Sequence, residues 1–433
     1  MLDILIIGAI AVSIALGYKT RINTGIFGIV AAYLIGVFAM GLQPADIVKM
    51  WPVSIFFVIF SISMFYNFAI ENGTLGTLAQ HMLYRTRNYP KSLPMVVFLA
   101  ATALASLGAG FFAVMAFFAP ITMLLCRKAG INPIIGAIAV NYGALAGNGF
   151  VISPGGAVFI SLMQHAGIGL DLAYSYEMKI FIVSIIVPIF VLLLLGKVMG
   201  KSKSQINGED IEEIEKPKKF TKIQKVTLVL IAGFVISVLI FPVLANLVPA
   251  VPEFASLQTS IDVGLVAMIF TVIGLFLRLG KEQTLLANVP WGTLLMICGV
   301  GMLITLAVKA GTIKMVATLL TTYVPVAILP FALTLLAGIM GLFCSTMGVI
   351  TPALFPLVPM ISQATGIDAG ILFLGIVMGA QATVISPISS GGSLLVAAVP
   401  EKERHQAFGD LFFKAAPICL LASLICIVIL CLV

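Results

Sequence analysis

Residues 141–156 read NYGALAGNGFVISPGG, and residues 381–393 read QATVISPISSGGS. Each stretch lies inside an almost uncharged run that is too long for one membrane span, because a helix crosses the hydrocarbon core in about 20 residues. Their Gly, Pro, Ser and Asn residues predict that the helix is interrupted. An interrupted backbone is tolerated in a membrane only where it lines a cavity, so we expect two broken helices, at about 131–165 and about 367–398, that border a binding site.

The rest of the chain is similarly apolar. Of 433 residues, 61% are hydrophobic and 9% are charged, whereas a soluble domain carries about 25% charged residues. This composition excludes a soluble globular protein, a disordered chain and a nucleic-acid-binding protein. The six cysteines are scattered singly, without a CxxC pair or a cluster of metal-ligand spacing. We therefore predict an all-α polytopic membrane protein that lies in a lipid bilayer.

One short segment holds much of the charge. Eight lysines fall between Lys197 and Lys225, and cytoplasmic loops of membrane proteins are rich in Lys and Arg. We take segment 198–224 as cytoplasmic. The other basic loops then lie on the same side of the membrane, provided that runs 92–126 and 326–361 each enter and leave the membrane on one side. We interpret these two runs as re-entrant hairpins, and we predict a multi-pass protein of the cell (inner) membrane with both termini outside.

The two halves of the chain resemble each other. Residues 151–154 and residues 384–387 both read VISP, 233 residues apart, and further matches follow in the same order along both halves. The pattern predicts repeats at 1–197 and 225–433, joined by a linker at 198–224. Each repeat would hold five transmembrane helices and one re-entrant hairpin, and this odd number of crossings gives the second repeat the inverted topology. Secondary transporters use this plan, with the site at the repeat interface.

The predicted breaks carry groups that suit an anion and a hard cation. A helix that begins at a break points N–H groups and its positive dipole end at the site, which favours a carboxylate, while opposing carbonyl and hydroxyl oxygens suit sodium. Gly155-Gly156 and Gly391-Gly392 allow the backbone to approach a ligand, and Asn148 and Gln381 could donate to it. Helix packing is the alternative explanation for Gly and Ser, and Asn141 is open between an interhelical hydrogen bond and a site contact.

Charged residues that the predicted breaks lack, and catalytic motifs that the sequence lacks, limit the possible functions. No Asp, Glu, Lys or Arg occurs within 141–156 or 381–393. Proton- or cation-coupled antiporters depend on an intramembrane carboxylate, so the antiporter class is disfavoured. The sequence contains no HExxH, no GxSxG and no intramembrane Asp pair, so we do not expect an enzyme. An anion would be held by dipoles and hydroxyl groups rather than by a buried cation.

At these residues the chain resembles the ion transporter superfamily, specifically the divalent-anion/sodium symporters and the related MatC-like dicarboxylate carriers. The resemblance covers essentially the whole chain and rests on Val289–Leu295, on the two hairpins and on the two broken spans. Ser345-Thr346-Met347 partly matches the Ser-Asn-Thr motif of the family's hairpin tips, whereas Gly108-Ala109-Gly110 does not. Where the family has Thr-Pro-Pro-Asn, this chain has Ser153-Pro154-Gly155-Gly156 and Ser390-Gly391-Gly392-Ser393. The resemblance implies a homodimer, an elevator mechanism and sodium-driven import of a di- or tricarboxylate.

We therefore predict a secondary active transporter that imports a small malonate- or succinate-like dicarboxylate, with sodium as the coupling ion and no other cofactor. The alternatives are a transporter of another anion, a cation antiporter of the same superfamily, or a membrane channel. The candidate substrate-binding residues are Gly108, Gly110, Asn148, Ser153, Pro154, Gly155, Gly156, Ser345, Thr346, Thr383, Ser389, Ser390, Gly391 and Gly392. The candidate sodium ligands are Ser106, Ala109, Asn148, Ser345, Gln381 and Ser386.

Overall fold

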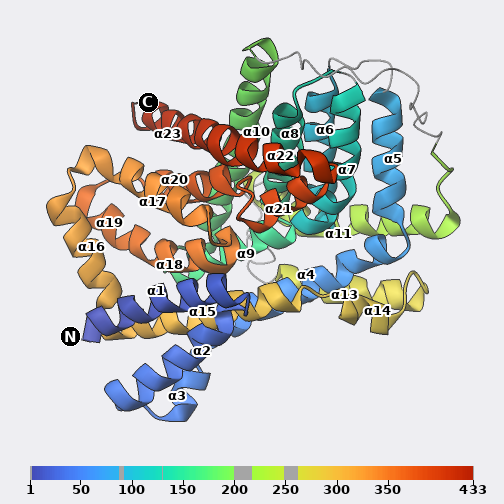
Figure 1. Ribbon diagram of the computed structural model, residues 1–433. Helices are drawn as coiled ribbons and strands as arrows, with labels where there is room; N and C mark the ends of the chain where they lie inside the picture. The colour runs from blue at the N-terminus through green and yellow to red at the C-terminus, as the bar shows by residue number, and fades with distance from the viewer. Residues whose placement is uncertain (1, 87–91, 129, 199–216, 248–261, 433) are drawn as a thin grey trace. The chain divides into compact units, whose positions relative to one another are not determined.

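The computed structural model describes residues 2–86, 92–128, 130–198, 217–247 and 262–432. Every regular element in these ranges is a helix (Figure 1), which confirms the predicted all-α class. Residues 199–216, which form most of the predicted linker at 198–224, lie outside the described residues.

Six helical segments of the described chain are long and apolar enough to cross a membrane. They are Leu2–Thr20, Val53–Glu71, Leu170–Val198, Trp291–Ala310, Thr346–Thr365 and Glu401–Leu432. A seventh candidate is the pair Thr312–Tyr323 and Val326–Gly341, which is bent by 113°. These helices confirm a multi-pass membrane protein, while the ten full spans and two re-entrant hairpins remain a prediction.

The chain folds into two compact units that we describe separately. The first unit consists of Met1–Phe56, Val158–Leu195 and Trp291–Val433, and the second of Phe57–Ala157 and Gly196–Pro290. Both units draw on both halves of the sequence. The repeats at 1–197 and 225–433 are a division of the sequence and stay a prediction.

The second unit contains the first predicted hairpin and the first predicted break. Helices α6 and α7 pack against α8 (Figure 1), and the rings of Phe65, Tyr66, Phe234 and Phe270 join α4, α11 and α13. The helices of this unit are most of α4 (Val53–Glu71), α5 (Thr74–Thr86), α6 (Leu93–Leu104), η3 (Ala105–Ala109), α7 (Phe111–Lys128), α8 (Pro133–Asn148), α11 (Lys222–Leu247), α13 (Val263–Phe276) and α14 (Glu282–Ala287).

The first unit contains the second predicted hairpin and the second predicted break. Helix α17 packs against α20, and α2 packs against α15 (Figure 1). The helices of this unit are α1 (Leu2–Thr20), α2 (Thr24–Leu34), η1 (Ile35–Ala39), α3 (Pro44–Val48), most of α9 (Pro154–His165) and α10 (Leu170–Val198), α15 (Trp291–Ala310), α16 (Thr312–Tyr323), η4 (Val326–Ile328), α17 (Leu329–Gly341), η5 (Thr346–Ile350), α18 (Thr351–Leu354), η6 (Phe355–Leu357), α19 (Val358–Thr365), α20 (Ala369–Thr383), α21 (Ser390–Ala397), η7 (Glu401–Glu403), α22 (Arg404–Asp410), η8 (Leu411–Ala415) and α23 (Ala416–Leu432).

A helix pair in each unit packs backbone to backbone through glycine at corresponding positions. In the second unit, a Cβ added to Gly147 of α8 would lie 2.1 Å from the carbonyl oxygen of Thr102 on α6. In the first unit, a Cβ added to Gly379 of α20 would lie 2.1 Å from the carbonyl oxygen of Thr334 on α17. Small residues permit such close approach between membrane helices. Both residues of the second contact lie 232 positions after those of the first.

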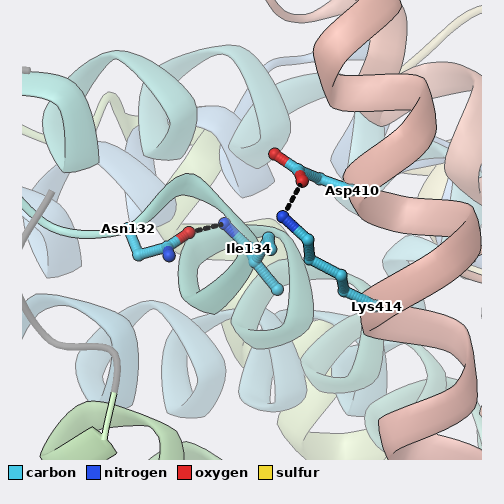
Figure 2. Close-up of polar contacts among 4 residues, drawn as sticks. All are labelled: Asn132, Ile134, Asp410 and Lys414. Atoms are coloured by element: carbon cyan, nitrogen blue, oxygen red, sulfur yellow. Dashed lines mark hydrogen bonds and ion pairs between the residues drawn. The ribbon is translucent and has the colours of Figure 1, made fainter.

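The helices that lead into the two breaks start with capped N-termini. The Oδ1 of Asn132 accepts a hydrogen bond from the backbone N–H of Ile134 at 3.0 Å (Figure 2), and the Oδ1 of Asp368 accepts one from Ile371 N–H at 3.3 Å. An Asx cap satisfies a backbone donor that the first turn leaves free. These caps set the starts of α8 and α20.

Candidate functional site

The first break lies between α8, which ends at Asn148, and α9, which begins at Pro154. The Ser153 hydroxyl is placed to donate to the carbonyl oxygen of Asn148 or to that of Phe150 (2.7 Å), and it accepts from Gly156 N–H at 3.3 Å. Ser153 therefore closes the turn and caps α9. The sequence predicts the same hydroxyl as a substrate ligand, and in the structure it is engaged by the backbone of the break.

The space beside each glycine of the pair Gly155-Gly156 is occupied by other residues of the same break. A Cβ on Gly155 would lie 2.3 Å from Nδ2 of Asn148, and a Cβ on Gly156 would lie 2.1 Å from the carbonyl oxygen of Phe150. The sequence predicts that these glycines allow a ligand to approach. The structure shows that both positions require glycine for the turn to fold back on the end of α8.

The second break, between Thr383 and the start of α21 at Ser390, repeats this geometry. The Ser389 hydroxyl is placed to donate to the carbonyl oxygen of Val384 or to that of Ser386 (2.8 Å), and it accepts from Gly392 N–H at 3.4 Å. A Cβ on Gly392 would lie 2.2 Å from the carbonyl oxygen of Ser386.

The hydrogen bonds correct the sequence register at the breaks. They make Ser389, 236 residues after Ser153, the counterpart of Ser153. The shared VISP letters had paired Ser153 with Ser386, 233 residues later. The hydroxyl of Ser386 instead accepts from Ile388 N–H at 3.3 Å. The letters mislead because the capping position, not the Ser-Pro pair, defines the start of the helix. The side chain of Ser390 lies outside the described part of the chain.

The tip of the first hairpin is shaped by two glycines with positive φ. Gly108 and Gly110 have φ values of +86° and +67°, which L-residues with a Cβ rarely adopt. Gly108 also faces the ring of Tyr66, since a Cβ there would lie 2.1 Å from the ring carbons. The hydroxyl of Tyr66 is buried and has no hydrogen-bond partner among the described residues. At this tip Ser106 is half-buried and Ala109 is buried.

The tip of the first hairpin lies beside the first break. A Cβ on Gly147, the residue before Asn148, would lie 2.9 Å from the backbone nitrogen of Ser106. The second unit therefore brings together all of its predicted site residues, which are Ser106, Gly108, Ala109, Gly110, Asn148, Ser153, Pro154, Gly155 and Gly156.

The tip of the second hairpin offers one uncommitted hydroxyl. The Ser345 hydroxyl accepts from Gly348 N–H at 3.1 Å and caps η5. Thr346 is buried, and its Oγ1 has no hydrogen-bond partner within the described ranges. Of the two predicted ligands in this hairpin, Thr346 is therefore the one whose hydroxyl makes no hydrogen bond to the described residues.

The end of α20 ties this hairpin to the second break. The Thr383 hydroxyl donates to the carbonyl oxygen of Gly338 on α17 at 2.7 Å, so this predicted ligand bridges two helices. The Oε1 of Gln381 accepts from the Ser184 hydroxyl of α10 at 3.4 Å. The first unit thus gathers the remaining predicted site residues, which are Ser345, Thr346, Gln381, Thr383, Ser386, Ser389, Ser390, Gly391 and Gly392.

Two buried polar residues stand out beyond the predicted set. Asn141 on α8 is fully buried, and neither its Oδ1 nor its Nδ2 has a partner in the part of the chain that the structure describes. The interhelical hydrogen bond considered for it is not formed there. The second residue, Glu177 on α10, is also fully buried and unpartnered in the described part.

The structure places Glu177 on the buried face of α10. Ala173, Ile180 and Ser184 are buried on the same helix, and their spacing places Glu177 on one face with them. Among the residues whose burial the structure describes, Glu177 is the one Asp, Glu, Lys or Arg that is buried. By contrast, the ammonium of Lys414 is largely exposed and pairs with Asp410 at 2.6 Å (Figure 2).

Comparison with known proteins finds membrane transporters. Residues 1–148 match the model of the N-terminal region of the dicarboxylate carrier protein MatC. No curated protein sequence matches the chain. The YdaH transporter of Alcanivorax borkumensis is similar in structure, with a TM-score of 0.61 and 17% identity over 89% of this chain and 86% of that one. MtrF of Neisseria gonorrhoeae, described with a class of antimetabolite efflux pumps, gives a TM-score of 0.59 and 12% identity over 92% and 84%.

The similarities to YdaH and MtrF extend over most of each chain and concern the fold. The match to a dicarboxylate carrier model covers the first third of the sequence, including the first hairpin and α8. The chain is a multi-pass membrane protein with the fold of these transporters, and its first 148 residues are similar to the N-terminal region of MatC.

Proposed function

We propose that the protein is a secondary active transporter of a small dicarboxylate of malonate or succinate type. The observation that carries the proposal is the match of residues 1–148 to the dicarboxylate carrier model. The helix breaks support it, because the N–H groups at the starts of α9 and α21 favour an anion. The side chain of Thr346 adds a free hydroxyl. No Lys or Arg is buried in the described part of the chain, so within each unit we assign carboxylate binding to N–H and hydroxyl groups of this kind.

We also propose the inverted-repeat plan, with repeats at 1–197 and 225–433. Two matched contacts support it. The α6–α8 contact at Thr102 and Gly147 recurs between α17 and α20, and the capped break at Ser153 recurs at Ser389. Unrelated helices share single contacts by chance, but a matched helix pair followed by a matched break is typical of an internal duplication.

Sodium is the proposed coupling ion, with ligands drawn from Ser106, Ala109, Asn148, Ser345, Gln381 and Ser386. Backbone carbonyls at unwound helix segments coordinate sodium in transporters built from broken helices. The elevator mechanism, the homodimer and the inner-membrane location complete the proposal and come from the family resemblance.

The function is tested by counterflow in proteoliposomes that contain the purified protein. Vesicles loaded with unlabelled malonate, succinate or a longer dicarboxylate should take up the labelled compound transiently above equilibrium, and the initial rate should saturate. Counterflow requires alternating access to one site, which a channel lacks. Flux that rises linearly with concentration would identify a channel, and an absence of counterflow for every dicarboxylate would contradict the proposed substrate class.

The coupling ion is tested in the same vesicles without internal substrate. An inward sodium gradient should drive uptake above the level reached with choline, and a sodium ionophore should abolish the difference. Equal uptake in sodium and in choline would show that sodium is not coupled, while leaving the counterflow result in place.

Replacing Thr346 with Val should weaken substrate binding. Val keeps the shape of Thr and removes only the hydroxyl that has no partner within the described residues. The loss of one hydrogen bond to a charged group, worth about 1.5–3 kcal/mol, predicts a KM for counterflow that rises at least tenfold. The melting temperature should not fall. Ser345→Ala is the comparison, because it removes the cap on Gly348 N–H and should lower the melting temperature. An unchanged KM in Thr346→Val would show that this hydroxyl does not contact the substrate.

A further inference from the structure

Glu177 is the buried group that the proposed binding chemistry does not use. Its side chain is 0% exposed, and both of its carboxylate oxygens lack a hydrogen-bond partner in the described residues. It lies on α10, a candidate membrane span. An ionised carboxylate that is buried without a donor or a counter-ion costs far more free energy than a neutral carboxylic acid. The surroundings of this carboxyl group therefore disfavour its ionised form in this conformation.

Ring contacts identify elements that pack against α10 next to Glu177. The ring of Tyr176, its neighbour on α10, lies 6.0 Å from the ring of Phe373 on α20, and Phe373 lies 4.7 Å from Phe355 in η6. Phe355 in turn lies 6.2 Å from Phe159 on α9. These contacts place α10 in one aromatic cluster with α20, the second hairpin and α9.

The titratable groups of these elements are few. Helix α20 and the segment from α18 to α19 contain none, and Asp368, which caps α20, engages the N–H of Ile371. The titratable residue of α9 is His165, which is exposed at the end of that helix. On α10, Lys179 is exposed, and its ammonium lies 5.6 Å from the ring centroid of Tyr176.

Glu177 lies in the first part of α10. It lies seven residues after Leu170, which is about 10 Å of helix. Ser175 and Lys179 are exposed on the opposite face. The same face of α10 continues to Ser184, which donates to Gln381 at the end of α20. A shift of α10 against α20 would therefore act on Glu177 and on the second break together.

We propose that Glu177 binds a proton that is transported together with the substrate. The protonated carboxyl is buried in the loaded carrier, and the proton leaves to water on the more alkaline side, where the group becomes a carboxylate. Intramembrane carboxylates perform this task in proton relays of transporters. The proposal rests on the transport function proposed above, and it adds a proton alongside sodium.

The test uses Glu177→Gln in proteoliposomes, because Gln keeps the size of the side chain and cannot titrate. A one-unit pH gradient, alkaline inside, drives at most about tenfold accumulation per coupled proton. Wild-type protein should approach that accumulation, whereas Glu177→Gln should show none. Counterflow at equal pH should persist in Glu177→Gln, because exchange needs no net proton movement. Accumulation driven by a sodium gradient should persist as well.

Two matched variants complete the test. Asp171→Asn removes an exposed carboxyl from the same helix and should keep the response to the pH gradient, and Glu177→Asp should keep part of it. The proposal is overturned if Glu177→Gln still accumulates substrate in the pH gradient, or if it loses sodium-driven accumulation too.

A measurement on the wild-type protein covers the case in which Glu177→Gln does not fold. A pH-sensitive dye trapped in the vesicles should report proton entry with the substrate, and an absence of proton entry overturns the proposal. If wild-type protein shows no counterflow at all, the transport function itself fails. Counterflow without any response to pH leaves that function standing and removes only the assignment of Glu177.

Discussion

Replacing Gly379 with Ala is expected to destabilise the protein strongly. The new Cβ would lie 2.1 Å from the carbonyl oxygen of Thr334, and because this obstacle is backbone, helices α17 and α20 would have to move apart. Overpacking of this kind costs about 1–3 kcal/mol. Gly147→Ala should have a similar effect in the second unit, because its Cβ would meet the carbonyl oxygen of Thr102 at the same distance of 2.1 Å.

Thermal unfolding of the purified protein in detergent measures this effect. Gly8→Ala on α1 is the matched control, since Gly8 is exposed and a Cβ there meets nothing within 4 Å. Ala is favoured over Gly in a helix by about 1 kcal/mol, so this control should melt at or above the wild-type temperature. If Gly379→Ala melts with the control, the backbone contact between α17 and α20 does not exist in the protein.

Replacing Gly108 with Ala is expected to abolish counterflow. Gly108 has a φ of +86°, and left-handed backbone costs a residue with a Cβ about 1–2 kcal/mol. The Cβ would also lie 2.1 Å from the ring carbons of Tyr66. Since Tyr66 is buried, its ring has no open space to enter, and the hairpin tip must shift from its position. The measurement is the counterflow rate per folded protein.

Gly110→Ala separates the two causes. Gly110 has a φ of +67° and a ψ of 150°, a conformation that is essentially restricted to glycine, but a Cβ there meets nothing within 4 Å. This variant therefore carries backbone strain at least as large as that of Gly108→Ala, but without the collision. It should lose less counterflow than Gly108→Ala does. Adding Tyr66→Ala to Gly108→Ala should restore part of the rate. Equal losses in the two glycine variants, with no recovery in the double variant, would show that the contact with Tyr66 does not position the tip.

The broken helices could be predicted from sequence because their cause is local. Proline at the first position of α9, and glycines two and three residues after each capping serine, determine where a helix stops and the next one starts. The exact register of the second break could not be predicted in this way. Two Ser-Pro pairs look equivalent as letters, but the hydrogen bonds to Ser153 and Ser389 depend on how each chain turns back onto the preceding helix.

The availability of each candidate ligand also depended on tertiary packing. Thr346 and Thr383 are equally plausible ligands in the sequence, yet Thr383 donates to Gly338 on a different helix and Thr346 has a free hydroxyl among the described residues. A side chain's partners lie on segments that are distant along the chain, and residue type does not specify them.

By itself, the sequence determined that this chain is all-helical, crosses a membrane and breaks two helices, since hydropathy and glycine–proline chemistry act within one segment. Only the tertiary structure decided that Gly108 must leave room for Tyr66 and that the carboxyl of Glu177 is buried. In the sequence Glu177 is an ordinary acidic residue between Tyr176 and Met178. Tertiary packing decides which face of α10 turns inward and therefore whether Glu177 is buried. The surroundings created by that packing then set the free energy of its ionised form.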